Sequence, residues 1–569
     1  MPYSIHDRRL YRRRGRRNAG VRVKKWFVVI ILGCAQFVMV LDSTVMNVSI
    51  STVVKDLDTS VTALQTAITF YTLTMAAVML LGAKLGDVWG RRRAFVIGGI
   101  VYAAGSLVTA LSPNIATLFI GWSVVEGLGA VLVIPAIAAL IANNYSGRDR
   151  VTAFALIGAI SGAAVAAGPL IGGFVTTYLS WRYVFFGEVV IMIFVLIFAR
   201  RVTDTSRPQK IRIDILSVVL SAAGLVLVVF GMLQSKTWGW VLPKISPTIG
   251  GHPIQPLGLS LVPYLITLGA FLLWLFFIRQ RFLVDHGRVP LVQVSMFSIK
   301  RLRAGLTVLA AQYAITAGLF FVIPVYLQMT LGYNALTTGL KIFPLSIALI
   351  LFSFVGTRLS VVWSPRRIVR LGQLILVVSA GFLLGSVSPE LKSVIFTFGM
   401  FFAGAGLGLL ASQLGNVNMS SVGEEQSSEV GGLQGVFQNL GSSLGTALIG
   451  SVLIASLATS FLGAVQSSDL PDSVTSQITT ASQSGVAIVP VSSVAGIAKK
   501  AGLSSSQGTE LTKLYSDSQV ASLRVSFFAL IVIAIVALLF SKNLPNDVVG
   551  GTRKRKKAAI PSSVLASGE

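Results

Sequence analysis

The chain has 569 residues, of which 54% are hydrophobic and only 12% are charged, and its mean hydropathy is +0.78. Soluble proteins carry about 25% charged residues. A soluble enzyme is therefore excluded, and a membrane protein is indicated, because a bilayer accommodates this much apolar surface. The single cysteine, Cys34, excludes an intramolecular disulfide and a cysteine-based metal cluster.

Fourteen apolar segments predict an all-α integral membrane protein with 14 transmembrane helices. In chain order they cover residues 26–48, 63–83, 94–111, 115–141, 151–178, 182–199, 214–234, 259–278, 304–328, 336–358, 367–387, 393–414, 430–460 and 522–541. The first segment follows a basic tail, as a signal peptide does. It is too long for one and contains Asp42, so we interpret it as a retained span.

The net charge of +26 is distributed unevenly along the chain. If the N-terminus is inside, 36 of the 47 Lys and Arg residues fall on the cytoplasmic side. The positive-inside rule then predicts a multi-pass protein of the cell (plasma) membrane with both termini in the cytoplasm. The charge sets topology and suits contact with anionic membrane lipids, so it does not indicate nucleic acid.

An internal repeat organises the spans. Residues 82–93 read GAKLGDVWGRRR and residues 356–367 read GTRLSVVWSPRR, with Asp87 aligned to Val361. A weaker echo links residues 125–132 with 403–410. Both pairs are eight spans apart, so two pseudo-repeated six-helix bundles plus two inserted helices, spans 7 and 8, are expected, which is a transporter architecture.

This repeat sets the expected division of the chain. It comprises a basic cytoplasmic N-terminal tail (1–25), an N-terminal six-helix bundle (26–200), a linker with the inserted spans (201–282), a cytoplasmic loop (283–303), a C-terminal six-helix bundle (304–545) with an extracytoplasmic loop (461–521), and a basic cytoplasmic tail (546–569). Within the outer loop, residues 492–502 and 509–521 suit short surface helices, and the loop is either a flexible tether or a lid over the outer mouth.

Several segments together resemble one family. Residues 82–93 resemble the loop 2–3 signature of the major facilitator superfamily, and Gly168-Pro169-Leu-Ile-Gly172-Gly173 resembles its GPxxGG antiporter motif. Residues 41–48, LDSTVMNV, are similar to the LDxTVVNV motif of the fourteen-span drug:proton antiporters of the quaternary-ammonium and multidrug efflux type. The resemblance covers residues 26–545 and implies efflux driven by a proton gradient. Ser123 stands where the family usually has Arg, so proton transfer through that Arg is not carried over.

Two of these motifs also have a physical interpretation of their own. Gly158, Gly162, Gly168 and Gly172 recur at helical spacings that permit close packing of a neighbouring helix, and Pro169 favours a bend. The loop is either a polar turn that sets topology or a gate. In the second case Asp87 and Arg91 form a charge lock that separates when the transporter changes state, and Gly90 and Arg92 are further gating residues.

Three of the 21 acidic residues fall inside predicted spans: Asp42, Glu126 and Glu188. An ionised carboxylate in the middle of a membrane costs about 2.5–3.5 kcal/mol even on the lenient scale, so it is paired, hydrated or protonated. For Asp42 and Glu126 the two interpretations are proton coupling or substrate binding, and a buried structural role. For Glu188 an ion pair with Arg182 at the rim of the membrane is an equal alternative to a functional role. Asp214, which opens span 7, is expected to cap a helix.

Other polar groups within spans are candidates to line the same cavity. They are Asn47, Tyr71, Gln312, Gln413 and Gln438, with Gln328, Asn416 and Asn439 beside them. No P-loop and no catalytic or metal-ligating constellation is present in the sequence, so neither an ATP-driven pump, an enzyme, a metal site nor a cofactor is expected.

The sequence therefore predicts a secondary active transporter that exports amphipathic, cationic drugs or related compounds in exchange for protons. Its expected partners are a small amphipathic substrate, protons and membrane lipids. The alternatives are an exporter of a lipid or endogenous metabolite on the same fold, and a non-transporting membrane sensor or scaffold.

Overall fold

A computed structural model describes residues 5–145, 147–204, 212–249, 252–422, 427–468, 470–482, 486 and 488–546. Fourteen helices in these ranges are long and apolar enough to cross a membrane, and each coincides with one predicted segment. The predicted all-α class is confirmed. The strands in the described ranges are β1 (Thr248–Ile249) and β2 (His252–Pro253), which form a short antiparallel hairpin.

The first half of the chain supplies the first six spans. Its elements are α1 (Ile5–Val48), α2 (Ile50–Asp56), α3 (Val61–Trp89), α4 (Arg91–Ala110), α5 (Ile115–Leu118), the π-helical η1 (Phe119–Glu126), α6 (Gly127–Asn144), α7 (Gly147–Tyr178), α8 (Arg182–Phe198) and the 3₁₀ turn η2 (Ala199–Arg201). The fourth span is formed by α5, η1 and α6 together, as one continuous rod. The two inserted spans follow as α9 (Ile215–Trp238) and α10 (Leu261–Asp285), with the 3₁₀ turns η3 (Pro256–Gly258) and η4 (Val294–Ser298) on either side of α10.

The second half supplies the last six spans. Its elements are α11 (Lys300–Val325), the π-helical η5 (Tyr326–Thr330), α12 (Ala335–Leu359), α13 (Pro365–Ser386), α14 (Ser393–Met419), α15 (Ser427–Gln466), α16 (Asp472–Ser482), α17 (Val491–Lys500), α18 (Ser505–Phe540) and the 3₁₀ turn η7 (Ser541–Asn543). Among the α-helices of this set, α16 and α17 are too short to span a bilayer.

Polar residues at the first turns explain where many helices begin. Ser60, Asn114, Asp214, Ser260, Asn334 and Ser504 each accept a hydrogen bond from a backbone N–H in the first turn. These groups satisfy donors that the helix leaves unpaired at its start. The predicted cap at Asp214 is confirmed.

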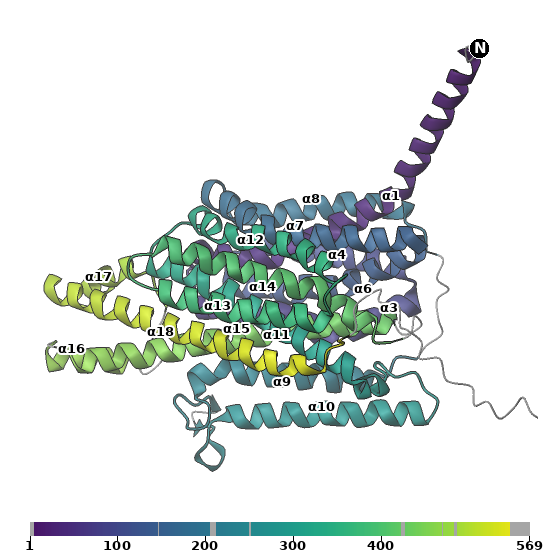
Figure 1. Ribbon diagram of the computed structural model, residues 1–569. Helices are drawn as coiled ribbons and strands as arrows, with labels where there is room; N and C mark the ends of the chain where they lie inside the picture. The colour runs from purple at the N-terminus through teal and green to yellow at the C-terminus, as the bar shows by residue number, and fades with distance from the viewer. Residues whose placement is uncertain are drawn as a thin grey trace, which may run out of the picture.

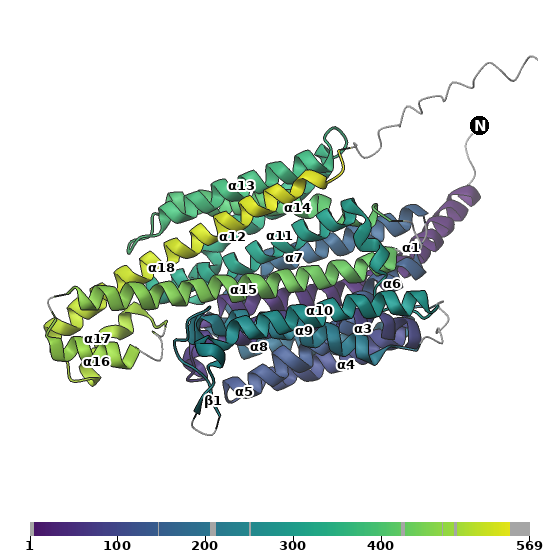
Figure 2. The ribbon, with the colours of Figure 1, turned by 90° about the horizontal axis from the view of Figure 1, so that it is seen from below.

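Two lines of contact join the halves of the chain, and we name them the α3–α15 seam and the α7–α12 seam after the helices that meet there. The inserted helix α9 packs on both α3 and α15, and α10 packs on α9. In Figure 1, α7 and α12 lie along one edge of the molecule and α9 and α10 along the opposite edge. Figure 2, seen from that opposite edge, shows α9 and α10 between α15 and α3.

The segment from 461 to 521 is largely helical in its described part. Helix α15 continues to Gln466, α17 matches the predicted surface helix at 492–502, and residues 509–521 belong to α18 rather than to a separate helix. Buried side chains from these elements join the main core. Helices α16 and α17, the end of α15 and the start of α18 project beyond the spans at one end of the molecule (Figure 1). We call this projecting part the cap.

Candidate functional site

The three acids of the predicted spans meet inside the first half of the chain. Asp42 comes from α1, Glu126 from the end of η1, and Glu188 from α8. One carboxylate oxygen of each lies within 4.8 Å of one from each of the others. All three side chains are buried, with 0%, 0% and 1% of their surface exposed. We call Asp42, Glu126 and Glu188 the carboxylate triad.

Aromatic side chains hold Asp42 in place. The indole Nε1–H of Trp122 donates to both carboxylate oxygens of Asp42, at 2.9 and 3.0 Å. The Trp122 ring stacks on Tyr71, with centroids 4.9 Å apart and an interplanar angle of 12°. Because both rings are fully buried, the donor is fixed and Asp42 is a pre-oriented acceptor.

Glu188 is held by two hydroxyls of α4. Tyr102 and Ser106 each donate to its Oε2, at 3.3 Å. Glycine at position 105 lets η1 approach α4, because an added Cβ there would lie 2.7 Å from Glu126 Cα. This close approach brings Glu126 beside the donors of α4.

Glu126 differs from its two neighbours. Neither of its oxygens has a hydrogen-bond partner within the described part of the chain, and Oε1 of Glu188 has none there either. Glu126 ends a π-helical stretch, a local widening that recurs at functional positions in helices. Ser123, one turn earlier, donates to the backbone carbonyl of Ala67, so this position holds α3 against η1.

The predicted alternative of a rim ion pair between Glu188 and Arg182 is wrong. Arg182 instead pairs with Asp56, and its second guanidinium nitrogen donates to the carbonyl of Ser112 at 2.8 Å. Burial alone would raise the pKa of Asp56, but hydrogen bonds from Arg182 and Trp181 outweigh it and hold that pKa below its usual value. This cation is therefore engaged at the helix ends, and the described ion pairs include none with the triad.

Three carboxylates this close repel one another strongly if all are ionised in a region of low dielectric. The arrangement becomes stable when protons or a positively charged group occupy it. Carboxylate oxygens also bind metal cations, and the three side chains are close enough to share one ion. The chemistry available to the triad is thus the reversible binding of positive charge.

The other predicted cavity residues have varied surroundings. Asn47 and Gln312 are buried, each with a carbonyl oxygen that has no hydrogen-bond partner in the described ranges, and Gln438 is half-buried. Gln413 donates instead to the carbonyl of Gly356, at 3.0 Å, which joins two helices of the second half. Gln328 joins the two halves of the chain.

Gln328 connects the two halves of the chain by hydrogen bonds at the end of the spans that lies next to the cap. Its Nε2 donates to the carbonyl of Val48 at 2.7 Å, and its Oε1 accepts from the backbone N–H of Ser51 at 3.0 Å and from the Ser51 hydroxyl. Sequence reasoning placed Gln328 among cavity residues. Its partners lie about 280 positions away, so no local pattern indicated a bridge.

The predicted GPxxGG segment packs closely on two helices. An added Cβ at Gly172 would lie 2.9 Å from Val45 of α1, and one at Gly173 would lie 2.7 Å from the Ala335 carbonyl of α12. Gly168 likewise faces Thr44, and Gly339 faces the Pro169 carbonyl. Gly158 and Gly162 do not follow the prediction of close packing, because no described residue lies within 4 Å of a Cβ added at either.

The loop at residues 82–93, predicted as either a polar turn or a gate, contains an ion pair and a helix boundary. Asp87 and Arg91 form an ion pair of 3.5 Å across Gly90, whose φ of +92° separates α3 from α4. Asp204, which follows the sixth span, accepts from the backbone N–H of Arg92 at 2.9 Å. It thereby caps α4 from a distant part of the chain, a role that sequence reasoning missed.

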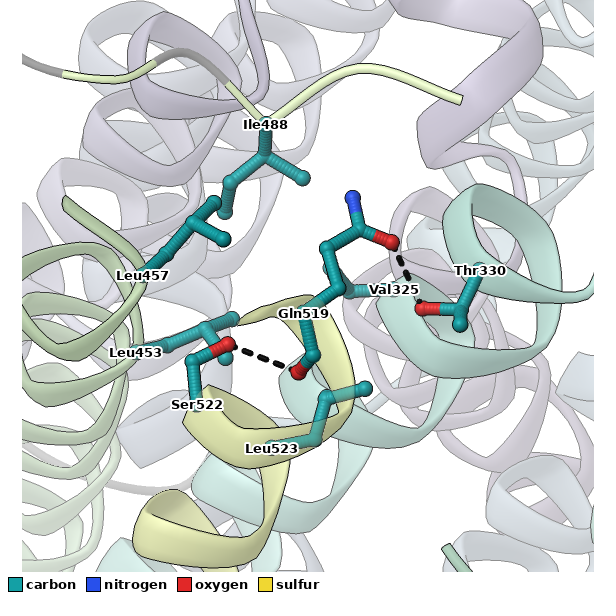
Figure 3. Close-up of a pocket in the computed structure, with 8 residues that line it drawn as sticks. All are labelled: Val325, Thr330, Leu453, Leu457, Ile488, Gln519, Ser522 and Leu523. Atoms are coloured by element: carbon teal, nitrogen blue, oxygen red, sulfur yellow. Dashed lines mark hydrogen bonds between the residues drawn. The ribbon is translucent and has the colours of Figure 1, made fainter. Parts of the chain in front are cut away.

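A small pocket lies where the cap meets the spans (Figure 3). Thr330 donates to Gln519 at 2.9 Å, and Leu453, Leu457 and Ile488 close the sides. Its volume of about 10 Å³ is close to what a single water needs. The pocket is a packing defect between cap and span and is too small for a substrate.

Comparisons with known proteins agree with this architecture. The family model described as Major Facilitator Superfamily matches residues 32–446. The chain is 29% identical over 437 residues to the puromycin resistance protein pur8 of Streptomyces alboniger, covering 75% of this chain and 82% of that protein. It is 24% identical to the tetracenomycin C resistance and export protein of Streptomyces glaucescens, over 97% of both.

A solved structure shares the fold. A bacterial homolog of the human lysosomal transporter Spinster, crystallised in an inward-facing and unoccupied conformation, matches with a TM-score of 0.57 and 15% identity. The alignment covers 92% of this chain and 98% of that one.

Proposed function

Because the chain belongs to the Major Facilitator Superfamily, we propose that it exports amphipathic, positively charged, drug-like compounds from the cytoplasm in exchange for protons. The observation that carries this proposal is the carboxylate triad, whose oxygens lie within 4.8 Å of one another in a fully buried site. Such a site favours the binding of positive charge, which both a proton and a cationic substrate supply.

Competition for the triad couples the two movements. A proton on Asp42 or Glu126 removes the negative charge that attracts a cation. The site therefore binds either a proton or the cationic substrate favourably, but not both together. Inward movement of protons then drives outward movement of substrate, because each ligand lowers the affinity for the other by the same factor. Trp122 can orient Asp42 in both states, since an indole N–H donates to a carboxylate and also to the carbonyl oxygen of a protonated carboxyl group.

The relatives support a drug-like substrate. One is named for resistance to puromycin and another for resistance to and export of tetracenomycin C. Export of a lipid or an endogenous metabolite is the alternative. It is the weaker candidate, because a neutral substrate would use the three buried carboxylates for protons alone and not for its own binding.

The charge distribution supports the orientation that export requires. With the termini in the cytoplasm, 36 of 47 basic residues lie on that side and the cap lies outside. The plasma membrane is the corresponding location, since a proton gradient across it drives the exchange.

A flux measurement across an imposed pH gradient tests the proposal. The wild-type chain in proteoliposomes should move a cationic dye such as ethidium only when the gradient is present. Asp42→Asn and Glu126→Gln should each lower this flux at least about tenfold, a change of about 1.4 kcal/mol in the limiting barrier. Residual dye binding should depend less on pH, because each amide removes one of the three carboxylates that can titrate.

Asp58→Asn is the matched control, because Asp58 is an exposed acid just beyond the same α1–α2 segment. It should transport as the wild type does. If both triad variants kept wild-type flux and pH dependence, the triad would be structural and the exchange mechanism would be wrong.

A further inference from the structure

The two seams between the halves of the chain are closed to different extents. Along the α3–α15 seam, contacts continue over most of the length of the helices. Gln65 donates to the Thr446 carbonyl at 2.9 Å toward the cap, and Ser443 donates to the Thr69 carbonyl at 3.2 Å further along. Toward the opposite end, a Cβ added at Gly435 would lie 3.4 Å from Met79.

The inserted helix α9 covers this same seam. Val229 and Leu233 are buried in one cluster with Leu73 of α3 and Ala447 of α15. The hydroxyl of Ser451 on α15 donates to the Met232 carbonyl of α9 at 3.2 Å. Because α9 contacts both halves and α10 lies beside it, lipid has no direct path into the α3–α15 seam (Figure 2).

The α7–α12 seam is closed only toward the cap. Gly173 packs on the backbone of Ala335 and Leu336, and the Leu336 N–H donates to Thr177 at 3.0 Å. Gly158 and Gly162 lie on the same face of α7 as Pro169 and Gly173, within about 60° of arc at 3.6 residues per turn. Among the described residues, nothing lies within 4 Å of a Cβ added at either of them, and Gly158 is exposed, so the half of the seam remote from the cap is open.

The facing helix shows the same opening. Thr357 lies on the face of α12 that carries Ala335 and Gly339, within about 40° of arc, yet it is exposed. Phe354, one turn earlier, is 63% exposed. The inserted pair α9 and α10 lies on the far edge of the molecule and does not cover this opening (Figure 1).

The walls of the opening carry no charge. Residues 151–181 and 342–357 contain no Asp, Glu, Lys or Arg. A path for ions would carry charged side chains, whereas an uncharged wall at membrane depth suits a molecule already dissolved in lipid.

We propose that the open half of the α7–α12 seam is a lateral portal through which amphipathic substrates pass from the cytoplasmic leaflet into the transporter. Because α9 and α10 cover the α3–α15 seam, substrate enters from lipid on the α7–α12 side alone. This inference rests on the proposed function for its substrate class and on the proposed orientation for the leaflet. The apolar part of the substrate stays in lipid contact while its cationic group moves toward the triad.

Lipid access can be measured without any transport. A bimane label is attached at Gly162→Cys in a Cys34→Ser background, and the protein is placed in vesicles that contain nitroxide-labelled phosphatidylcholine. Ala163→Cys, an exposed neighbour on the outward face of α7, gives the quenching of a lipid-facing label, and Ile497→Cys in the cap gives that of a water-facing label. The portal predicts quenching at Gly162 of more than half that at Ala163, and quenching at the level of Ile497 would overturn it.

A flux experiment tests the role of the opening. Gly162→Leu fills it, and Ala163→Leu adds a side chain of the same kind on the lipid face as the matched control. The probe is trimethylammonium-diphenylhexatriene, which fluoresces only in lipid, so its removal from the leaflet is followed directly. We expect Gly162→Leu to slow this removal at least about fivefold, because overpacking blocks the gap, and Ala163→Leu to leave it unchanged.

Equal rates in the two variants would overturn the portal as a route for substrate. If the wild-type protein moves no dye in this assay, the proposed substrate class fails. The quenching result then still decides whether lipid reaches the α7–α12 seam.

Discussion

The two halves of this chain share a helical plan but differ in buried charge. The first half buries three carboxylates, Asp42, Glu126 and Glu188, at 1% exposure or less. In the described part of the second half, from α11 to α18, the buried polar side chains are amides and hydroxyls, and no carboxylate is buried among them. Among the described residues, only the first half therefore buries groups whose charge changes on binding protons, and the buried polar groups of the second half stay neutral.

This difference has a physical basis. A buried carboxylate costs several kcal/mol unless it is neutralised, whereas a buried amide needs only hydrogen bonds. Restricting the costly groups to one half keeps the other half stable in every charge state. The two copies of the loop repeat differ in the same way, since Asp87 in the first aligns with Val361 in the second.

Neutralising the third member of the triad should give the largest effect of this comparison. Glu188→Gln removes a titratable group but keeps an acceptor for Tyr102 and Ser106, so we expect the fold to survive. Proton-driven flux should fall at least about tenfold. Gln312→Ala removes a buried amide of the second half and should change the pH dependence of flux very little. Equal shifts in pH dependence would show that the halves are not divided in this way.

Substitutions in the two copies of the loop repeat should change the turnover rate by a smaller factor. Asp87→Asn breaks the 3.5 Å ion pair with Arg91, and we expect it to slow turnover by roughly three- to tenfold with little change in substrate affinity, as gating elements do. Arg366→Ala alters the second copy, whose loop lacks the acid, and should slow turnover less. Initial rates over a range of dye concentrations separate turnover from affinity. A larger effect in the second loop would reverse the assignment of the gate.

The smallest effect concerns the inserted pair, which belongs to neither half. Arg279 donates two hydrogen bonds to Asp214, at 2.9 and 3.1 Å, and these bonds lower the pKa of Asp214 to about 2. Because this pKa lies below the ordinary value of 3.8, the stability that the pair contributes is present at neutral pH and is lost as the pH falls from about 4 toward 2.

Asp214→Ala should therefore reduce stability by about 1 kcal/mol at pH 7, since it removes both a helix cap and a partly exposed ion pair. Thermal unfolding in detergent measures the difference, which should shrink as the pH approaches 2. A difference that is independent of pH would attribute the effect to packing alone.

Local sequence signals were sufficient for the elements and for the types of functional residue. Every predicted span is present because 20 or so apolar residues in a bilayer have to satisfy their backbone groups within a helix. Asp42, Glu126 and Glu188 could be singled out because charge inside such a segment is costly. Asp214 could be assigned as a cap because capping acts within one turn.

The arrangement of these residues was decided by tertiary structure alone. The donors to the triad, the cap that Asp204 places on α4, and the bridge from Gln328 to Ser51 all join positions about 80 to 280 residues apart. Glu188 meets Tyr102 rather than Arg182 because α8 turns this side chain into the bundle, while Arg182 at its first turn reaches Asp56. Hydropathy reports whether a side chain prefers lipid to water, and it contains no information on which of its neighbours in space will be a donor.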